Sequence, residues 1–327
     1  MPHPLLSLSR RGLLGLAAAA AATFASAMPL AAQAPDTVRI GYQRSSTLIA
    51  LLKADGELEK ALEPLGVKVS WHEFTSGLPL LEALNLGKID FSADVADTVP
   101  VFAQAAGAKL VFIAEEAPSP AAQAILVPEG STIASLADLK GKKVAVTKGA
   151  GSHYLLLAAL AKGGLTFKDI TPAYLTPADG RAAFVGGNVD AWVAWDPFLA
   201  TTQAASKARI LADGSNGLAS YKRYYLSSEA FAQSSPKVLA IIFEKLKAKG
   251  EWVKAHPKEA AAQLATLWGI DASAVEVANG RRSYKVGAVT KAGLGEQQKI
   301  ADTFFKEGLL PREVDTSTVS IWQPAGL

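Results

Sequence analysis

The stretch Thr147–Tyr154, with the sequence TKGAGSHY, has the residue types of an anion-binding site. It follows an expected strand, residues 144–146, and opens an expected helix, residues 154–162. Backbone amides at a helix start carry about half a positive charge from the helix dipole and bind anions. Ser152 adds a hydroxyl donor, with His153 and Tyr154 beside it. The alternative is an ordinary strand-to-helix turn with Ser152 as its N-cap.

Asp97 and Asp196 are the two acidic residues that could act together, as in a glycoside hydrolase. Each comes before a proline at the start of an expected helix, where Asp is a preferred N-cap, so capping is the favoured interpretation. Thr98 supplies a second hydroxyl donor. Trp195, directly before Asp196, is either a core residue or a cover for the apolar tail of a ligand.

Gln43, after the first expected strand, is a further neutral donor. Arg282 either reaches the same region from the C-terminal segment or lies in solvent. The chain has no cysteine and four separated histidines, and it contains neither a Gly-x-Ser-x-Gly nor a His-Glu-x-x-His motif. We therefore expect a binding protein without catalytic residues, metal or cofactor.

The charge balance also limits the function. The chain has 33 basic and 30 acidic residues, with no long run of one sign. Proteins that bind nucleic acid concentrate basic residues into a patch, so nucleic acid is excluded as a partner.

The first 34 residues have the composition of a cleavable export signal. Arg10 and Arg11 precede an uncharged, alanine-rich run that contains small-residue sites ending at Ala27 and Ala34. The alternative is a membrane anchor, because the run exceeds 18 residues. The residues SRRGLL at 9–14 resemble the twin-arginine motif, so export by that route and by the general route both stay open. We expect a periplasmic protein.

The elements that must position these residues alternate along the chain. Strands are expected at 38–42 and 67–74, with a helix at 48–62 between them. A helix running into GKIDF at 87–91 is repeated one hundred residues later by a helix running into GGNVDAW at 186–192. This pattern predicts an α/β fold of two similar lobes, each a mainly parallel sheet flanked by helices.

Two crossovers divide the lobes. Pro118–Pro120 marks the first and Arg223–Ser227 the second, which places 35–122 in lobe 1, 123–224 in lobe 2 and the mostly helical 225–327 in lobe 1 again. Ligands of α/β sheets bind beyond the carboxyl ends of the strands. The predicted site is therefore a cleft between the lobes, closed by a hinge.

Several segments resemble the periplasmic aliphatic sulfonate-binding proteins of ABC importers. The segments that carry this resemblance are residues 41–43, 80–85, 90–91, 100–108, 136–141, 148–153, 174–179, 187–192, 195–197 and 321–324.

The resemblance implies a two-lobed type II periplasmic binding fold. It also implies capture of an alkanesulfonate as a sulfur source, with an ABC permease and its ATPase in the inner membrane as partners. We expect a monomer. The residues expected to bind the ligand are Gln43, Asp97, Thr98, Ser152, His153, Tyr154, Trp195, Asp196 and Arg282. The alternatives are a binder of taurine, nitrate or another small oxyanion, and an enzyme related to thiamine-pyrimidine synthase.

Overall fold

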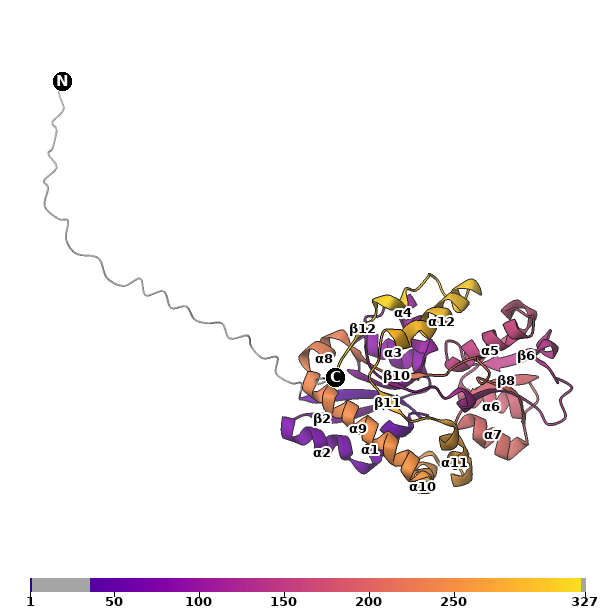
Figure 1. Cartoon of the computed structure of the whole chain (residues 1–327), viewed down its shortest axis with the longest axis horizontal. Helices are drawn as coiled ribbons and strands as arrows, with labels where there is room; N and C mark the ends of the chain where they lie inside the picture. Colours follow the sequence, from indigo (N-terminus) through magenta and orange to yellow (C-terminus); the bar gives the residue numbers. More distant parts are fainter. Residues whose placement is uncertain (2–35, 325–327) are drawn as a thin grey trace. The chain divides into compact units, whose positions relative to one another are not determined.

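The computed structural model describes Met1 and residues 36–324. The expected export signal, with both cleavage sites and the two arginines, lies outside the described residues. Residues 36–324 form two β-sheets with helices packed against each (Figure 1). The expected α/β class with two sheet-based lobes is confirmed.

The first lobe is built on a seven-stranded sheet of order β11-β4-β10-β3-β1-β2, with β12 pairing with β4. Its strands are β1 (Thr37–Gln43), β2 (Lys68–Phe74), β3 (Phe91–Ala96), β4 (Leu110–Glu116), β10 (Arg223–Ser228), β11 (Val286–Gly287) and β12 (Ser320–Ile321). Strands from both ends of the described chain therefore share one sheet.

Helices cover both faces of this sheet. They are α1 (Thr47–Asp55), α2 (Glu57–Leu62), α3 (Gly77–Asn85), α4 (Thr98–Ala105), α8 (Glu229–Ser234), α9 (Pro236–Ala255), α10 (Pro257–Trp268), α11 (Ala272–Arg281) and α12 (Gly295–Lys306). Ile40 packs with α1 and α9 on one face, whereas Val95 packs with α3 and α4 on the other. Along β4, Val111 and Ile113 pack on the first of these faces and Phe112 on the second, which is the alternation of a strand with two covered faces.

The second lobe is built on a five-stranded sheet of order β7-β6-β8-β5-β9. Its elements are β5 (Gln123–Val127), β6 (Lys143–Val146), α5 (Gly151–Lys162), β7 (Thr171–Tyr174), α6 (Pro177–Val185), β8 (Ala191–Trp195), α7 (Phe198–Ser206) and β9 (Arg209–Asp213). The chain passes between the sheets after β4 and again before β10.

Both sheets are mixed. Pairings within the strand-helix-strand units are parallel, as between β1 and β2 or between β6 and β7. The strands that carry the two crossovers, β5 and β10, run antiparallel to their neighbours. A chain that leaves one lobe for the other and returns enters each sheet in the opposite direction, which the alternating sequence pattern does not show.

The helix expected over 48–62 is divided in two. Gly56 adopts a left-handed conformation (φ +64°), and its amide bonds back to Leu52 and Lys53, which ends α1 and lets α2 begin. A glycine takes this conformation without steric cost.

Two C-terminal helices contact both lobes. Ala274 and Ala278 of α11 pack against Ala200 of α7 in the second lobe. Phe304 of α12 lies 4.9 Å, ring centre to ring centre, from Phe102 of α4 in the first lobe, and it also packs on Tyr154 of α5. Each of these helices therefore links the two sheets.

Candidate functional site

The loops that follow β3 and β6 bring the two lobes into contact. At Gly151, the first residue of α5, an added Cβ would lie 2.6 Å from the Tyr221 ring and 2.9 Å from the Ala96 Cβ of the first lobe. At Gly149 it would lie 2.7 Å from Leu78. The carboxyl edges of the two sheets thus meet with the α5 N-terminus between them, as expected for an inter-lobe site.

Helix α5 begins three residues earlier than the sequence predicted. Its N-cap is Ala150, whose side chain cannot cap, so the alternative reading of Ser152 as the N-cap is wrong. Ser152 lies in the first turn, fully buried, and its Oγ has no hydrogen-bond partner in the described part of the chain. The His153 amide donates to the Ala150 carbonyl at 2.9 Å, so Ser152 offers its hydroxyl beside the first-turn amides of Gly151 and of Ser152 itself.

Thr98 lies at the matching place in the first lobe, as the first residue of α4. It is fully buried, and its Oγ1 also lacks a partner among the described residues. Asp97 caps this helix, as expected: its Oδ1 accepts from the Thr98 amide at 3.0 Å and its Oδ2 from the Lys222 amide at 3.1 Å. Burial, with the nearby Glu296 charge, raises the pKa of Asp97 to about 7.

His153 lies away from this region. Its ring packs among Phe167, Tyr174 and Phe304, and its Nδ1 accepts a hydrogen bond from the Gly149 amide at 3.2 Å. Burial, followed by the Lys148 charge, lowers the pKa of His153 to about 3. His153 is therefore neutral at pH 7, and it uses one amide of the glycine-rich loop.

Tyr154 and Trp195 are both buried. Tyr154 packs in the second-lobe core beside Phe304, and burial raises the pKa of its hydroxyl. Trp195 packs with Ala96, Ala150 and Tyr221 in an apolar cluster made by residues of both lobes. Trp195 is thus a core residue at the contact between the lobes.

Asp196 is buried and bonded at both carboxylate oxygens. Its Oδ1 accepts from the Ala200 amide in the first turn of α7 at 3.0 Å, although the N-cap of that helix is Pro197 rather than Asp196, the expected cap. Arg281 of α11 contacts both oxygens, at 3.3 and 3.4 Å. Burial raises the pKa of Asp196 to about 6, against the opposing effect of Arg281.

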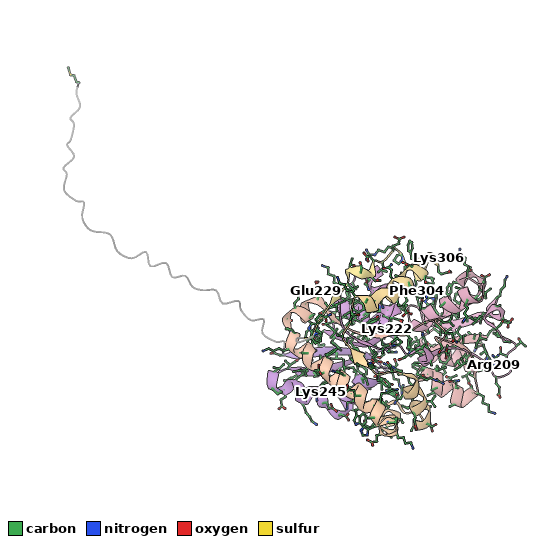
Figure 2. All side chains as sticks on the ribbon, in the orientation of Figure 1. Arg209, Lys222, Glu229, Lys245, Phe304 and Lys306 are labelled. Carbon is green, nitrogen blue, oxygen red and sulfur yellow. The ribbon has the colours of Figure 1, made fainter. Side chains whose placement is uncertain are left out.

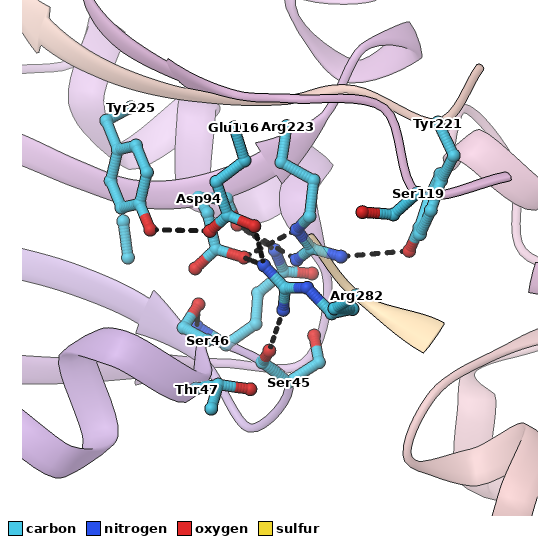
Figure 3. Close-up of polar contacts among 12 residues, drawn as sticks. Ser45, Ser46, Thr47, Asp94, Glu116, Ser119, Tyr221, Arg223, Tyr225 and Arg282 are labelled. Atoms are coloured by element: carbon cyan, nitrogen blue, oxygen red, sulfur yellow. Dashed lines mark hydrogen bonds and ion pairs between the residues drawn. The ribbon is translucent and has the colours of Figure 1, made fainter. Parts of the chain in front are cut away.

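Arg282 is buried in an ion cluster of the first lobe, whereas solvent was the default expectation for it (Figure 3). Its Nη2 lies 3.1 Å from Asp94 and 2.5 Å from Glu116, and its Nη1 donates to the Ser45 carbonyl. Arg223 pairs with Asp94 at 2.5 Å in the same cluster. Two arginines therefore face two carboxylates in this cluster.

Burial would lower the pKa of Arg282, but Glu116 and Asp94 outweigh it and hold that pKa well above its ordinary value. Gln43 lies at the edge of this cluster, buried, and its Nε2 donates to the Asp94 carbonyl at 3.2 Å. These contacts position the loop after β1.

Gln123 is a candidate that the sequence analysis missed. It is the first residue of β5, is 1% exposed, and neither atom of its side-chain amide has a partner in the described residues. The only sequence signal was its place directly after the proline-marked crossover.

Comparisons with known proteins agree with this arrangement. The NMT1/THI5-like family model matches residues 63–260. A protein of Escherichia coli K12 named for aliphatic sulfonate binding is 39% identical over 324 residues, covering 99% of this chain and 98% of that one. The chain belongs to the aliphatic sulfonate-binding members of the NMT1/THI5-like family.

Solved structures extend the comparison. The alkanesulfonate-binding protein SsuA of Xanthomonas axonopodis pv. citri, bound to MOPS, is 37% identical with a TM-score of 0.83, covering 88% of this chain and 98% of that one. The desulfurization enzyme DSZB shares the fold at 16% identity and a TM-score of 0.63, covering 88% and 96%.

Several hollows lie on the surface of the first lobe, away from the contact between the lobes. One of about 400 Å³ is lined by Tyr42, Arg44, Lys53 and Trp268 among others. Tyr42 therefore faces the α1 side of its sheet. Of the labelled charged side chains, Arg209 lies near the edge of the view and Lys245 lies over α9 (Figure 2).

Within the described residues, no group of three or more His, Asp or Glu side chains is placed to hold a metal ion. None of the helices described is both long enough and apolar enough to cross a membrane.

Proposed function

We propose that this protein captures an aliphatic sulfonate between its two lobes and delivers it to an ABC importer. The observation that carries the proposal is the pair of buried hydroxyls, Thr98 and Ser152, each in the first turn of a helix and each without a partner in the described chain. They come from different lobes, so one ligand that accepts from both would link the lobes.

The chemistry of a sulfonate suits this arrangement. A sulfonate is ionised at every ordinary pH and only accepts hydrogen bonds, so neutral donors and helix N-termini can bind it. Asp97 and Asp196 already accept hydrogen bonds from backbone amides of the protein, so we do not assign them to the sulfonate. Arg282 is balanced by Asp94 and Glu116, so we assign it the positioning of the loop after β1.

The inference that this protein takes part in transport is drawn from the proteins that it matches. The matched proteins are named for sulfonate binding, and we infer a permease and its ATPase as partners. We place the protein in the periplasm, with residues 1–34 as its export signal and with 35–122, 123–224 and 225–327 as its lobe segments. DSZB shows that an enzyme can share this fold, but a binder needs no catalytic group and the closer relatives are named as binding proteins.

Titration calorimetry of the mature chain tests the proposal. The panel is ethanesulfonate, MOPS, taurine, nitrate and sulfate. We expect the sulfonates of the panel to bind more tightly than nitrate and sulfate, and to be unchanged by mass spectrometry after incubation. Tightest binding of nitrate or sulfate, or turnover of a sulfonate, would contradict it.

A further inference from the structure

Gln123 occupies the same edge of the second sheet as the loops after β6 and β8. It pairs in register with Trp195, the last residue of β8. Because β5 runs antiparallel to β8, the first residue of β5 lies beside the carboxyl end of β8. Gln123 therefore stands at the strand ends that face the first lobe.

The side chain of Gln123 lies on the face of the sheet that α5 covers. Ile125 and Val127 pack in the cluster that contains Leu155 and Leu156 of α5, whereas Ala124 and Leu126 pack in the cluster on the opposite face. Successive strand residues alternate between faces, so Gln123 shares the α5 face with Ile125. Ser152 opens α5 at the same end.

A buried amide with neither atom bonded is unusual, since nearly all buried polar groups find a partner. The carboxamide of Gln123 carries both a donor and an acceptor, and neither has a partner within the described part of the chain. Turning the amide by 180° exchanges the positions of its nitrogen and oxygen, and both atoms lack a partner in either orientation. A ligand that presents one acceptor and one donor close together could bond to both the Nε2 and the Oε1 of Gln123.

We propose that Gln123 contacts the bound ligand and selects sulfonates that carry a hydrogen-bond donor on the second carbon from sulfur. Its Nε2 donates to a sulfonate oxygen, and its Oε1 accepts from the hydroxyl or amino group of the ligand. This proposal rests on sulfonate capture between the lobes. A plain alkanesulfonate leaves Oε1 unpaired and is bound less tightly, because an unpaired buried acceptor is costly.

The test uses 2-hydroxyethanesulfonate and propane-1-sulfonate, which differ by a hydroxyl in place of a methyl. By titration calorimetry we expect the wild-type protein to bind the hydroxy compound about tenfold more tightly, the effect of about one hydrogen bond. Gln123→Met should bring that ratio to about one. Gln104→Met, the same change at the far end of α4, should leave the ratio at about ten.

A second variant, Gln123→Glu, tests the same contact in case Gln123→Met does not fold. Gln123→Glu keeps the acceptors but places a charge beside the anion, so it should weaken both ligands at least tenfold. Equal wild-type affinities, or an unchanged ratio in Gln123→Met, would overturn this inference and leave sulfonate capture standing. Failure of the wild-type protein to bind either sulfonate would overturn both.

Discussion

Arg282 and Glu116, 166 positions apart in the chain, form a buried ion pair with Nη2 and Oε2 2.5 Å apart. Arg282 follows α11, and Glu116 ends β4, the last strand before the first crossover. Asp94 of β3 shares the same guanidinium. The cluster therefore links the C-terminal segment to two strands of the first sheet at the edge where the lobes meet.

Replacing Arg282 with methionine should destabilise the protein strongly. The change leaves two buried carboxylates with Arg223 as their remaining guanidinium partner in this cluster, and breaking a buried ion pair costs about 3–5 kcal/mol. Urea unfolding followed by circular dichroism would measure this. Arg209→Met, at the exposed edge of β9, should cost less than about 1 kcal/mol. Adding Glu116→Gln to Arg282→Met should recover part of the loss, and no recovery would argue against charge balance as the cause.

This cluster could not be predicted from the sequence. Asp94, Glu116 and Arg223 are charged residues far apart in the chain, and no spacing relates them to Arg282. Their contact depends on the second crossover, which places β10 between β3 and β4. The antiparallel insertion of β10 depends on pairing between distant strands, whereas sequence patterns report local periodicity.

The α/β class and most elements were predictable because their signals are local. Strand β2, expected over 67–74, is found at Lys68–Phe74. The start of α5 was predicted too late in the chain, because the glycine-rich residues 149–151 are typical of a loop. In the structure Gly151 already begins the helix. A helix start at residue 154 makes Ser152 a candidate N-cap and places His153 in the loop. In the structure the His153 ring packs in the second lobe.

Asp97→Asn should stabilise the protein increasingly as the pH rises from about 4 to 7. Burial raises the folded-state pKa of Asp97 to about 7, against 3.8 as the ordinary value, so the folded state holds a proton that the unfolded state has lost. Wild-type stability therefore falls with rising pH in this window, by up to about 1.4 kcal/mol per pH unit from this group. Asparagine does not ionise, so the variant does not lose this stability as the pH rises. Urea midpoints measured from pH 4 to 8 would show it.

The comparison must be between variants, because His153 acts in the opposite direction. Its folded pKa of about 3 lies below the ordinary 6.5, so its contribution is complete above pH 6.5 and is lost as the pH falls. This term is common to both proteins and cancels in their difference. Asp302→Asn, at an exposed position of α12, should give a constant difference from wild type. A constant difference for Asp97→Asn as well would show that Asp97 is ionised in the folded protein at pH 4.

Gly151→Val should hold the lobes apart. A Cβ at this position meets the Tyr221 ring and Ala96 at less than 3 Å, so the two sheet edges must separate to admit it. Solution scattering should show that a saturating alkanesulfonate reduces the radius of gyration of the wild-type protein, but not that of this variant. Gly295→Val, also at the first residue of a helix but with open space around it, should behave as wild type. A wild-type radius unchanged by ligand would mean that the lobes do not close on binding.

The two unpartnered hydroxyls should each contribute to sulfonate affinity. Ser152→Ala or Thr98→Val removes one donor to a charged group, at about 1.5–3 kcal/mol, which corresponds to roughly ten- to a hundredfold in Kd. Ser152→Asp should nearly abolish binding by repulsion. The positive end of the α5 dipole favours a carboxylate in the first turn, but Ser152 is fully buried, so this change should also lower the melting temperature.

Thr202→Val is the matched control for these variants. Its Oγ1 is also buried and without a partner in the described residues, but it lies within α7 rather than in the first turn of a helix at the lobe contact. Calorimetry with ethanesulfonate should therefore give wild-type affinity for Thr202→Val and weakened affinity for the other two single changes. Wild-type affinity in Ser152→Asp would place the anion elsewhere. Equal losses in all three single variants would mean that any buried hydroxyl matters through packing alone, and the assignment of Thr98 and Ser152 to the sulfonate would then fail.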